Sequence, residues 1–160
     1  MTEFKYIDHS AEFDAFRDCR KGRVLAVDYG KKNIGLAYSD EFRLTAQPLP
    51  SLPNLGKKDF LKRIRALAET LEIREVVIGM PFRMDGGRGD AALAMEKITR
   101  AIEETLKVAV TEMDERLSTI EADEIWRKMT LRRQRKYRTA DSLAAALILE
   151  RFIRSADCDV

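Results

Sequence analysis

The chain has 160 residues, of which 45% are hydrophobic and 35% are charged, and these values fit one domain with a real core and a soluble surface. It carries 29 Lys and Arg and 27 Asp and Glu, which gives a net charge of +2. A net charge this small says little about binding partners, so only the distribution of charge along the chain can indicate them. No apolar run approaches the roughly 20 residues that cross a bilayer, and the first twenty residues contain no signal peptide. We therefore expect a cytoplasmic protein that does not bind membranes.

The few cysteines and histidines exclude several kinds of chemistry. Cys19 and Cys158 lie near opposite ends of the chain, which does not suit a disulfide scaffold or a cysteine-based zinc site, so both are expected to be reduced. The single histidine, His9, excludes a histidine pair for metal and argues against a Ser-His-Asp or Cys-His triad. An enzyme of this composition must use carboxylates, hydroxyls, lysines and arginines.

The first elements follow a polar start. Residues 1–22 show no clear strand period and are interpreted as an N-terminal extension, with a helix over 11–20 and a domain over 23–155. The apolar run 23–28 ends in an acid and predicts a buried strand followed by a turn, and 33–39 predicts a strand that forms a hairpin with it. A third strand is predicted over residues 42–47, closed by three prolines at 48, 50 and 53.

From residue 57 the apolar residues follow the helical period, and helices then alternate with strands. The predicted helices cover 57–71, 90–106, 118–129 and 139–153, and the predicted strands cover 75–79 and 108–113. A glycine-rich loop over 84–89 contains Asp85, which is interpreted as a turn residue. This order predicts an α/β fold in which a mixed five-stranded sheet, three antiparallel strands and then two parallel ones, has helices on both faces.

Acidic residues stand at the ends of these elements. Asp28 closes the first strand, Asp114 and Glu115 follow the last, and Asp141 lies in the first turn of the final helix. Functional groups gather beyond the carboxyl ends of strands, and carboxylates that converge repel one another unless a cation neutralises them. Oxygen ligands favour Mg²⁺ or Mn²⁺, and two such ions can activate water against a phosphodiester.

Two of these acids also have an ordinary structural interpretation. Asp114 and Asp141 could be helix-start residues that satisfy free backbone N–H groups and the helix dipole. Asp28 is different, because an acid at the end of an apolar strand needs a partner.

Basic residues concentrate in one stretch of the sequence that contains no acid. They are Arg127, Lys128, Arg132, Arg133, Arg135, Lys136 and Arg138. We interpret this stretch as a flexible segment that contacts a phosphate backbone, with a solvated loop that binds nothing as the alternative. Lys31 and Lys32 add positive charge beside Asp28. Acids that hold metal ions, ringed by cations that hold phosphates, are typical of a nuclease.

Four motifs in chain order, over roughly residues 23–153, resemble the YqgF/RuvX family. They are Asp28-x-Gly30-x-Lys32-x-Ile34-Gly35-Leu36-Ala37, then Val76-Val77-Ile78-Gly79-Met80-Pro81 with Met84-Asp85-Gly86, then Asp114-Glu115-Arg116-Leu117-Ser118-Thr119, and a basic loop followed by Asp141-Ser142-Leu143-Ala144-Ala145-Ala146-Leu147-Ile148-Leu149. The family has an RNase H-like fold and is described as Holliday-junction-resolvase-like nucleases and, in bacteria, as factors that process the 5′ end of pre-16S rRNA.

The resemblance implies roles for particular residues. Asp28, Glu115 and Asp141 match the acidic positions expected to bind Mg²⁺ or Mn²⁺, and Asp114 is the alternative ligand if Glu115 points into solvent. The expected phosphate-binding residues are Lys31, Lys32, Arg116, Arg132, Arg133, Arg135, Lys136 and Arg138.

The sequence departs from the pattern at one strand. The related RuvC-type resolvases carry an acid on the strand that here holds Gly79, so the second carboxylate must come from the Asp114-Glu115 corner. The N-terminal extension is also longer than expected.

The function that the resemblance implies is a metal-dependent nuclease for structured nucleic acid, RNA or DNA, with a homodimer left open. The alternative is a nucleic-acid-binding module without catalysis that assists ribosome or transcription complexes. Asp28-x-Gly30 also resembles the phosphate loop of actin-like ATPases, but that fold needs two such domains and a chain about twice as long.

Overall fold

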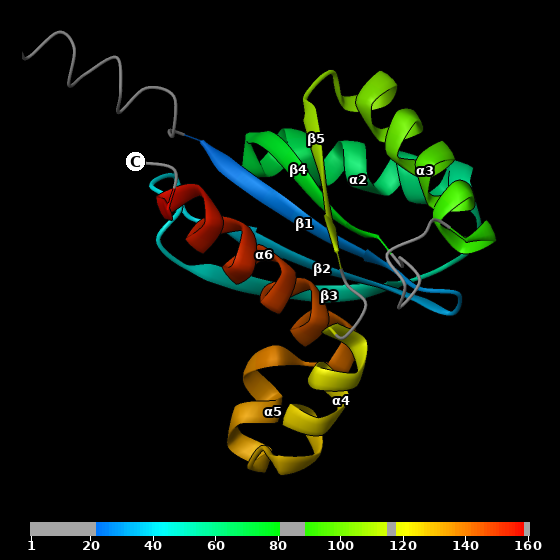
Figure 1. The fold of residues 1–160 in the computed structure, drawn as a ribbon. Coiled ribbons are helices and arrows are strands. Elements are labelled where there is room, and N and C mark those ends of the chain that lie inside the picture. Colours follow the sequence, from blue (N-terminus) through cyan, green and yellow to red (C-terminus); the bar gives the residue numbers. More distant parts are fainter. Residues whose placement is uncertain (1–21, 81–88, 115–117, 159–160) are drawn as a thin grey trace, which may run out of the picture.

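The computed structural model describes residues 22–80, 89–114 and 118–158 (Figure 1). All of the predicted extension over 1–22 except Gly22, including its helix, and most of the loop over 84–89 therefore lie outside the described residues. The strands are β1 (Arg23–Tyr29), β2 (Asn33–Ser39), β3 (Ala46–Pro53), β4 (Ile73–Met80) and β5 (Ala109–Asp114). The helices are α2 (Lys57–Leu71), α3 (Asp90–Leu106), α4 (Ser118–Lys128), α5 (Leu131–Tyr137) and α6 (Ala140–Cys158).

The five strands form one sheet in the order β3-β2-β1-β4-β5. β1 pairs antiparallel with β2, and β2 pairs antiparallel with β3. β4 lies between β1 and β5 and is parallel to both. The predicted mixed sheet, with a hairpin-linked half followed by a crossover-linked half, is confirmed.

Helices cover both faces of the sheet, and the alternation of side chains along β1 shows which residues face which helices. Leu25 and Val27 pack in a core with side chains of α2 and α3. Val24 and Ala26 pack on the other face against α6, through residues such as Ala145 and Leu149. In Figure 1, α6 crosses one face of the sheet, while α2 and α3 lie behind the other.

The helices α4 and α5 pack beside the N-terminal half of α6 (Figure 1). Their contact with α6 forms a small third core around Ala122, Leu143 and Ala144, against which Trp126 and Met129 pack. None of the described helices is long and apolar enough to span a membrane.

Two expectations about local structure are wrong. The third strand was expected to stop at the prolines, yet β3 contains Pro48, Pro50 and Pro53. It tolerates them because it is an edge strand, on which a missing N–H donor costs least.

The basic stretch is also more ordered than the expected flexible segment. Arg127 and Lys128 end α4, and the other cations lie on or next to α5. The Gln134 side chain donates a hydrogen bond to the carbonyl oxygen of Trp126 at 2.8 Å, which fastens α5 to α4. None of the α5 residues is buried, so water solvates their charges and the helix tolerates them.

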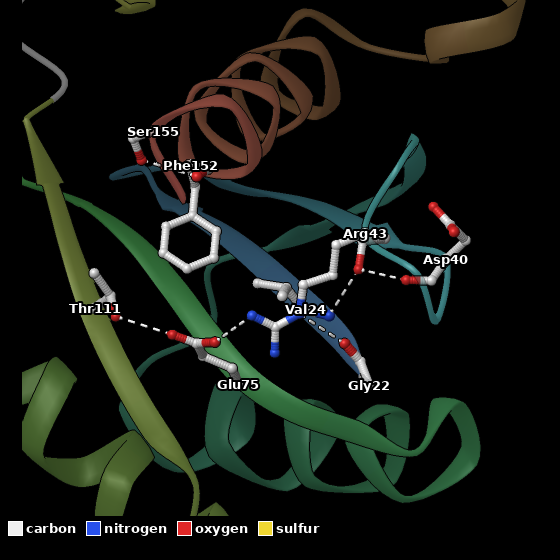
Figure 2. Close-up of polar contacts among 9 residues, drawn as sticks. Gly22, Val24, Asp40, Arg43, Glu75, Thr111, Phe152 and Ser155 are labelled. Carbon is white, nitrogen blue, oxygen red and sulfur yellow. Dashed lines mark hydrogen bonds and ion pairs between the residues drawn. The ribbon is translucent and has the colours of Figure 1, made fainter. Parts of the chain in front are cut away.

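The loop between β2 and β3 is fastened to the sheet at the end where β1 begins. Figure 2 shows that the Arg43 guanidinium donates to a Glu75 carboxylate oxygen at 2.8 Å and to the carbonyl oxygen of Gly22 at 3.0 Å. Glu75 also accepts a hydrogen bond from the Thr111 hydroxyl at 3.2 Å. This network connects the β2–β3 loop to β4 and β5, far from the acidic end of β1.

Candidate functional site

Asp28 lies near the carboxyl end of β1, on the face of the sheet that α6 covers. Val24 and Ala26 pack against α6, and the two-residue period of a strand places the Asp28 side chain on the same face. Asp28 is half-buried, as expected for an acid that follows a buried apolar strand and lies at the edge of a core.

Gly35 brings the start of α6 to Asp28. It is the cross-strand partner of Asp28 in β2, so the two residues face the same side of the sheet. A Cβ atom on Gly35 would lie 2.0 Å from the carbonyl oxygen of Asp141, a distance that no side chain can occupy. Only glycine therefore allows the first turn of α6 to lie directly on β2, next to Asp28.

Two hydroxyl side chains fix the first turn of α6. The Thr139 hydroxyl accepts a hydrogen bond from the backbone N–H of Ser142 at 3.1 Å and donates to the Ser142 oxygen at 3.0 Å. The buried Ser142 hydroxyl donates to the carbonyl oxygen of Leu49 in β3 at 2.6 Å. Sequence analysis missed both as positioning residues, although Thr139 has the chemistry of a helix N-cap.

The environment of Asp141 is acidic. Burial and the negative charge of Asp123 on α4 raise the pKa of the Asp141 carboxyl above its ordinary value. Sequence analysis did not single out Asp123, because it lies in the middle of a polar helix and only the packing of α4 beside α6 brings it near. Such crowding favours a bound cation, and carboxylate oxygens suit Mg²⁺ or Mn²⁺.

The third predicted ligand, Glu115, and the predicted phosphate-binding residue Arg116 lie outside the described residues. Within the described part of the chain, no three Asp, Glu, His or Cys side chains are grouped to hold a metal ion. The structure therefore brings together Asp28 and the turn that carries Asp141, and leaves the full ligand set as a prediction.

β4 is the strand on which the related RuvC-type resolvases carry an acid, and in this chain it holds Gly79 near its end. Gly79 pairs with Met113, and Met113 packs in the core under α6, so β4 presents no carboxylate to this face at that position. Asp114 is exposed at the end of β5. Since Val110 packs in the core under α2 and α3, alternation places Asp114 on that face, opposite the one that Asp28 occupies.

The turn after Asp28 carries the exposed cations Lys31 and Lys32. The backbone N–H of Asn54 donates to the carbonyl oxygen of Lys32, and the Asn54 side chain donates to that of Gly30, each at 2.8 Å. These contacts fix the turn at the edge of the site. Asn54 was not predicted, because it is distant in sequence from the turn that it holds.

The remaining predicted cations lie away from this turn. Arg132, Arg133, Arg135 and Lys136 are exposed on α5, and Arg138 is exposed at its C-terminal end. They form a positive surface on the α4–α5 pair, which packs beside the α6 turn that carries Asp141 (Figure 1).

Comparison with known proteins shows which family the chain belongs to. Residues 22–155 match the family model described as "RuvX: Holliday junction resolvase". The chain is 33% identical over 137 residues to a protein of Dictyoglomus thermophilum, a match that covers 86% of this chain and 99% of that protein. It is 34% identical over 131 residues to a protein of Syntrophomonas wolfei, which covers 82% and 93%. Both relatives carry the name "Putative pre-16S rRNA nuclease".

Solved structures share the fold. The fowlpox virus resolvase in complex with Holliday junction DNA superposes with a TM-score of 0.55 at 16% identity, covering 84% of this chain and 98% of that one. The fowlpox virus resolvase crystallised as such gives a TM-score of 0.51 at 14% identity, covering 83% and 99%. These likenesses confirm the predicted RNase H-like architecture. By the match over residues 22–155 and by its relatives, the chain belongs to the RuvX family.

Proposed function

We propose that this protein is a nuclease that hydrolyses phosphodiester bonds in structured nucleic acid, with Mg²⁺ or Mn²⁺ as its cofactor. Membership of the RuvX family supports the class of reaction. The observation that supports the proposal is the close approach of Gly35 to the backbone of Asp141, because Gly35 pairs with Asp28 and the start of α6 therefore lies next to the end of β1.

The metal ligands in this proposal are Asp28, Asp141 and Glu115. Asp114, which the sequence offered as the alternative to Glu115, is not among them, because it lies on the face of the sheet opposite to Asp28. When bound, two divalent ions would activate a water molecule and stabilise the leaving oxygen of the phosphodiester. Asp28 and Asp141 supply negative charge from two elements, and Asp123 adds to it. Lys31, Lys32 and Arg116 would hold phosphate groups at the edge of the acids.

The name of the relatives suggests pre-16S rRNA as a substrate of this chain, and the description of the family model suggests Holliday-junction-like DNA. For the rRNA, the family resemblance implies cleavage at the 5′ end. The exposed cations of α5 would bind the phosphate backbone of either one, since such contacts carry no sequence information.

The second candidate is a nucleic-acid-binding module without catalysis. The observation in its favour is Gly79, which leaves β4 without a carboxylate on the α6 face. The presence of Asp28 and Asp141 argues against this candidate, because carboxylates at a surface that only binds phosphates would repel them.

Replacing Asp28 by Asn separates the two candidates. The variant keeps the size of the side chain but removes its charge, and an amide is a poor ligand for a position between two cations. In single-turnover assays with Mg²⁺ and Mn²⁺ on a Holliday junction, a flap and a pre-16S rRNA fragment, we expect cleavage to fall at least about a hundredfold. Binding should hold or tighten, because one repulsion of phosphate is lost.

The matched control is Glu104→Gln, which removes an exposed acid at the far end of α3. It should leave both cleavage and binding unchanged. Equal, slow cleavage by the wild type and Asp28→Asn, with equal binding, would replace the nuclease by the binding module.

A further inference from the structure

A pocket of about 460 Å³ lies between α4, α5 and α6. Its volume falls in the range of about 300–1,000 Å³ that is usual for ligand sites. Leu143 and Leu147 of α6 form part of its wall, and the half-buried Tyr137 stands at the end of α5 beside them. The pocket therefore offers apolar and aromatic surface on a part of the molecule that is otherwise strongly cationic.

Positive charges surround this apolar surface. Lys128 and Arg133 line the pocket and are exposed, and the Lys136 ammonium lies 5.6 Å from the centre of the Tyr137 ring. One acid, Glu150, lines the pocket, on the turn of α6 that follows Leu147. A ligand that fits must bring a flat apolar group for the wall and negative charge for Lys128 and Arg133.

An unpaired nucleotide has both properties. A duplex hides the faces of its bases in the stack and offers mainly phosphates to exposed cations. A single-stranded segment can place a base against an aromatic ring while its phosphates meet lysine and arginine. The combination in this pocket therefore favours single-stranded over duplex nucleic acid.

The pocket also lies close to the acids. Leu147 follows Asp141 by six residues, which is about 9 Å along the axis of α6. On α4, Lys128 follows Asp123 by five residues, and the charge of Asp123 acts on Asp141. On both α6 and α4, the pocket residues therefore lie about one and a half turns from the acid. A few nucleotides span this distance.

We propose that this pocket binds one unpaired nucleotide of the substrate, close to the bond that is cut, with its base against Tyr137 and its phosphates at Lys128 and Arg133. This inference rests on the proposed function and narrows its substrate to nucleic acid with a single-stranded segment beside the cleavage site.

The test measures binding by fluorescence anisotropy, with a single-stranded oligonucleotide and a duplex of the same sequence. Tyr137→Leu removes the ring and should weaken single-strand binding at least about fivefold, while duplex binding stays within twofold. Tyr137→Phe keeps the ring and should bind like the wild type. Arg132→Ala, a charge on α5 that does not line the pocket, should weaken both ligands to the same degree.

Tyr137 also packs against two cores, so a second measurement uses the wild type alone. An oligonucleotide with photoreactive 5-iodouracil should crosslink to Tyr137 or to other residues of the pocket. Crosslinks only at sites outside the pocket would overturn the inference, as would equal loss of both ligands, or no loss, in a folded Tyr137→Leu protein. A wild type that binds neither oligonucleotide but binds a Holliday junction or a pre-16S rRNA fragment would overturn the pocket assignment alone. A wild type that binds none of these ligands would overturn the proposed function as well.

Discussion

Gly35 shows how one missing side chain allows the start of α6 to lie on β2 next to Asp28. In the sequence Gly35 is only one residue of a motif, and its role comes from a contact with Asp141, more than a hundred positions away. The positions of Asp28 near the end of β1 and of Asp141 in the first turn of α6 were predictable, because local sequence patterns mark the ends of elements. The roles of three other residues could not be predicted, because they depend on the packing of α4, α5 and α6. These residues are Asp123, Thr139 and Tyr137.

Asp40 gives a residue-scale prediction that depends on pH. Its carboxylate accepts hydrogen bonds from the backbone N–H groups of Phe42, Leu44 and Thr45 and from the Thr45 hydroxyl. Burial alone would raise the pKa of Asp40, but these donors outweigh it and hold the pKa below its ordinary value. Folding therefore favours the ionised form, and Asp40 stabilises the fold above its unfolded-state pKa of about 3.9.

We expect Asp40→Ala to lower the free energy of unfolding by about 1 kcal/mol near pH 7, a modest value because water screens this carboxylate. The difference from the wild type should shrink as the pH falls below about 4 and through the folded-state pKa, since the wild type then loses the same contribution. Denaturant titrations at several pH values measure it. Glu41→Gln, at an exposed ion pair with an N···O distance of 3.8 Å, is the control and should show neither effect. A difference that does not depend on pH would mean that the charge of Asp40 contributes nothing.

At the scale of elements, β3 and α5 show the limits of reading a sequence by local preferences. Prolines normally end a strand, but at the edge of this sheet β3 continues through them. A run of cations normally repels itself into a loop, but a hydrogen bond from Gln134 to α4 and open solvent around α5 allow a helix. In both cases the place of the element in the fold decides, and that place is set by distant residues.

The ordered basic surface of α5 predicts how nucleic-acid binding depends on salt. Replacing Arg132, Arg133 and Arg135 by Ala should weaken binding to all nucleic acids without sequence preference. The slope of log affinity against log salt concentration should flatten by up to about 0.7–0.9 for each phosphate contact that is lost. Binding titrations at four or more salt concentrations measure this slope.

The control for this experiment removes three exposed cations from the opposite face of the sheet. Lys62, Lys97 and Arg100 lie on α2 and α3, so their replacement by Ala changes the net charge equally without touching α5. If both triple variants flatten the slope alike, the protein attracts nucleic acid by its overall charge, and α5 is not the contact surface.

At the scale of the whole molecule, one end of the sheet holds the candidate site and the other end holds an ion-pair network. The end where β1 finishes holds Asp28, the contact with α6 and the cations of the β1–β2 turn. The end where β1 begins holds the Arg43–Glu75 network, about four residues or 13 Å away along β1. The RNase H-like fold could be predicted from the order of elements and four motifs. The separation of the candidate site from the Arg43–Glu75 network follows only from the register of the strands.

This separation predicts that the Arg43–Glu75 pair stabilises the fold without serving cleavage. Its side chains are 16% and 19% exposed, so the pair lies between a surface and a buried ion pair. We expect Arg43→Gln and Glu75→Gln each to lower the free energy of unfolding by about 1–2 kcal/mol, and the double-mutant cycle to give a coupling of about 1 kcal/mol. The cleavage rate per folded molecule should match the wild type, because neither side chain lies near the acids. A folded variant that cuts more slowly would show instead that the two ends of the sheet are coupled, and a coupling energy near zero would show that each partner acts through Gly22 or Thr111 rather than through the pair.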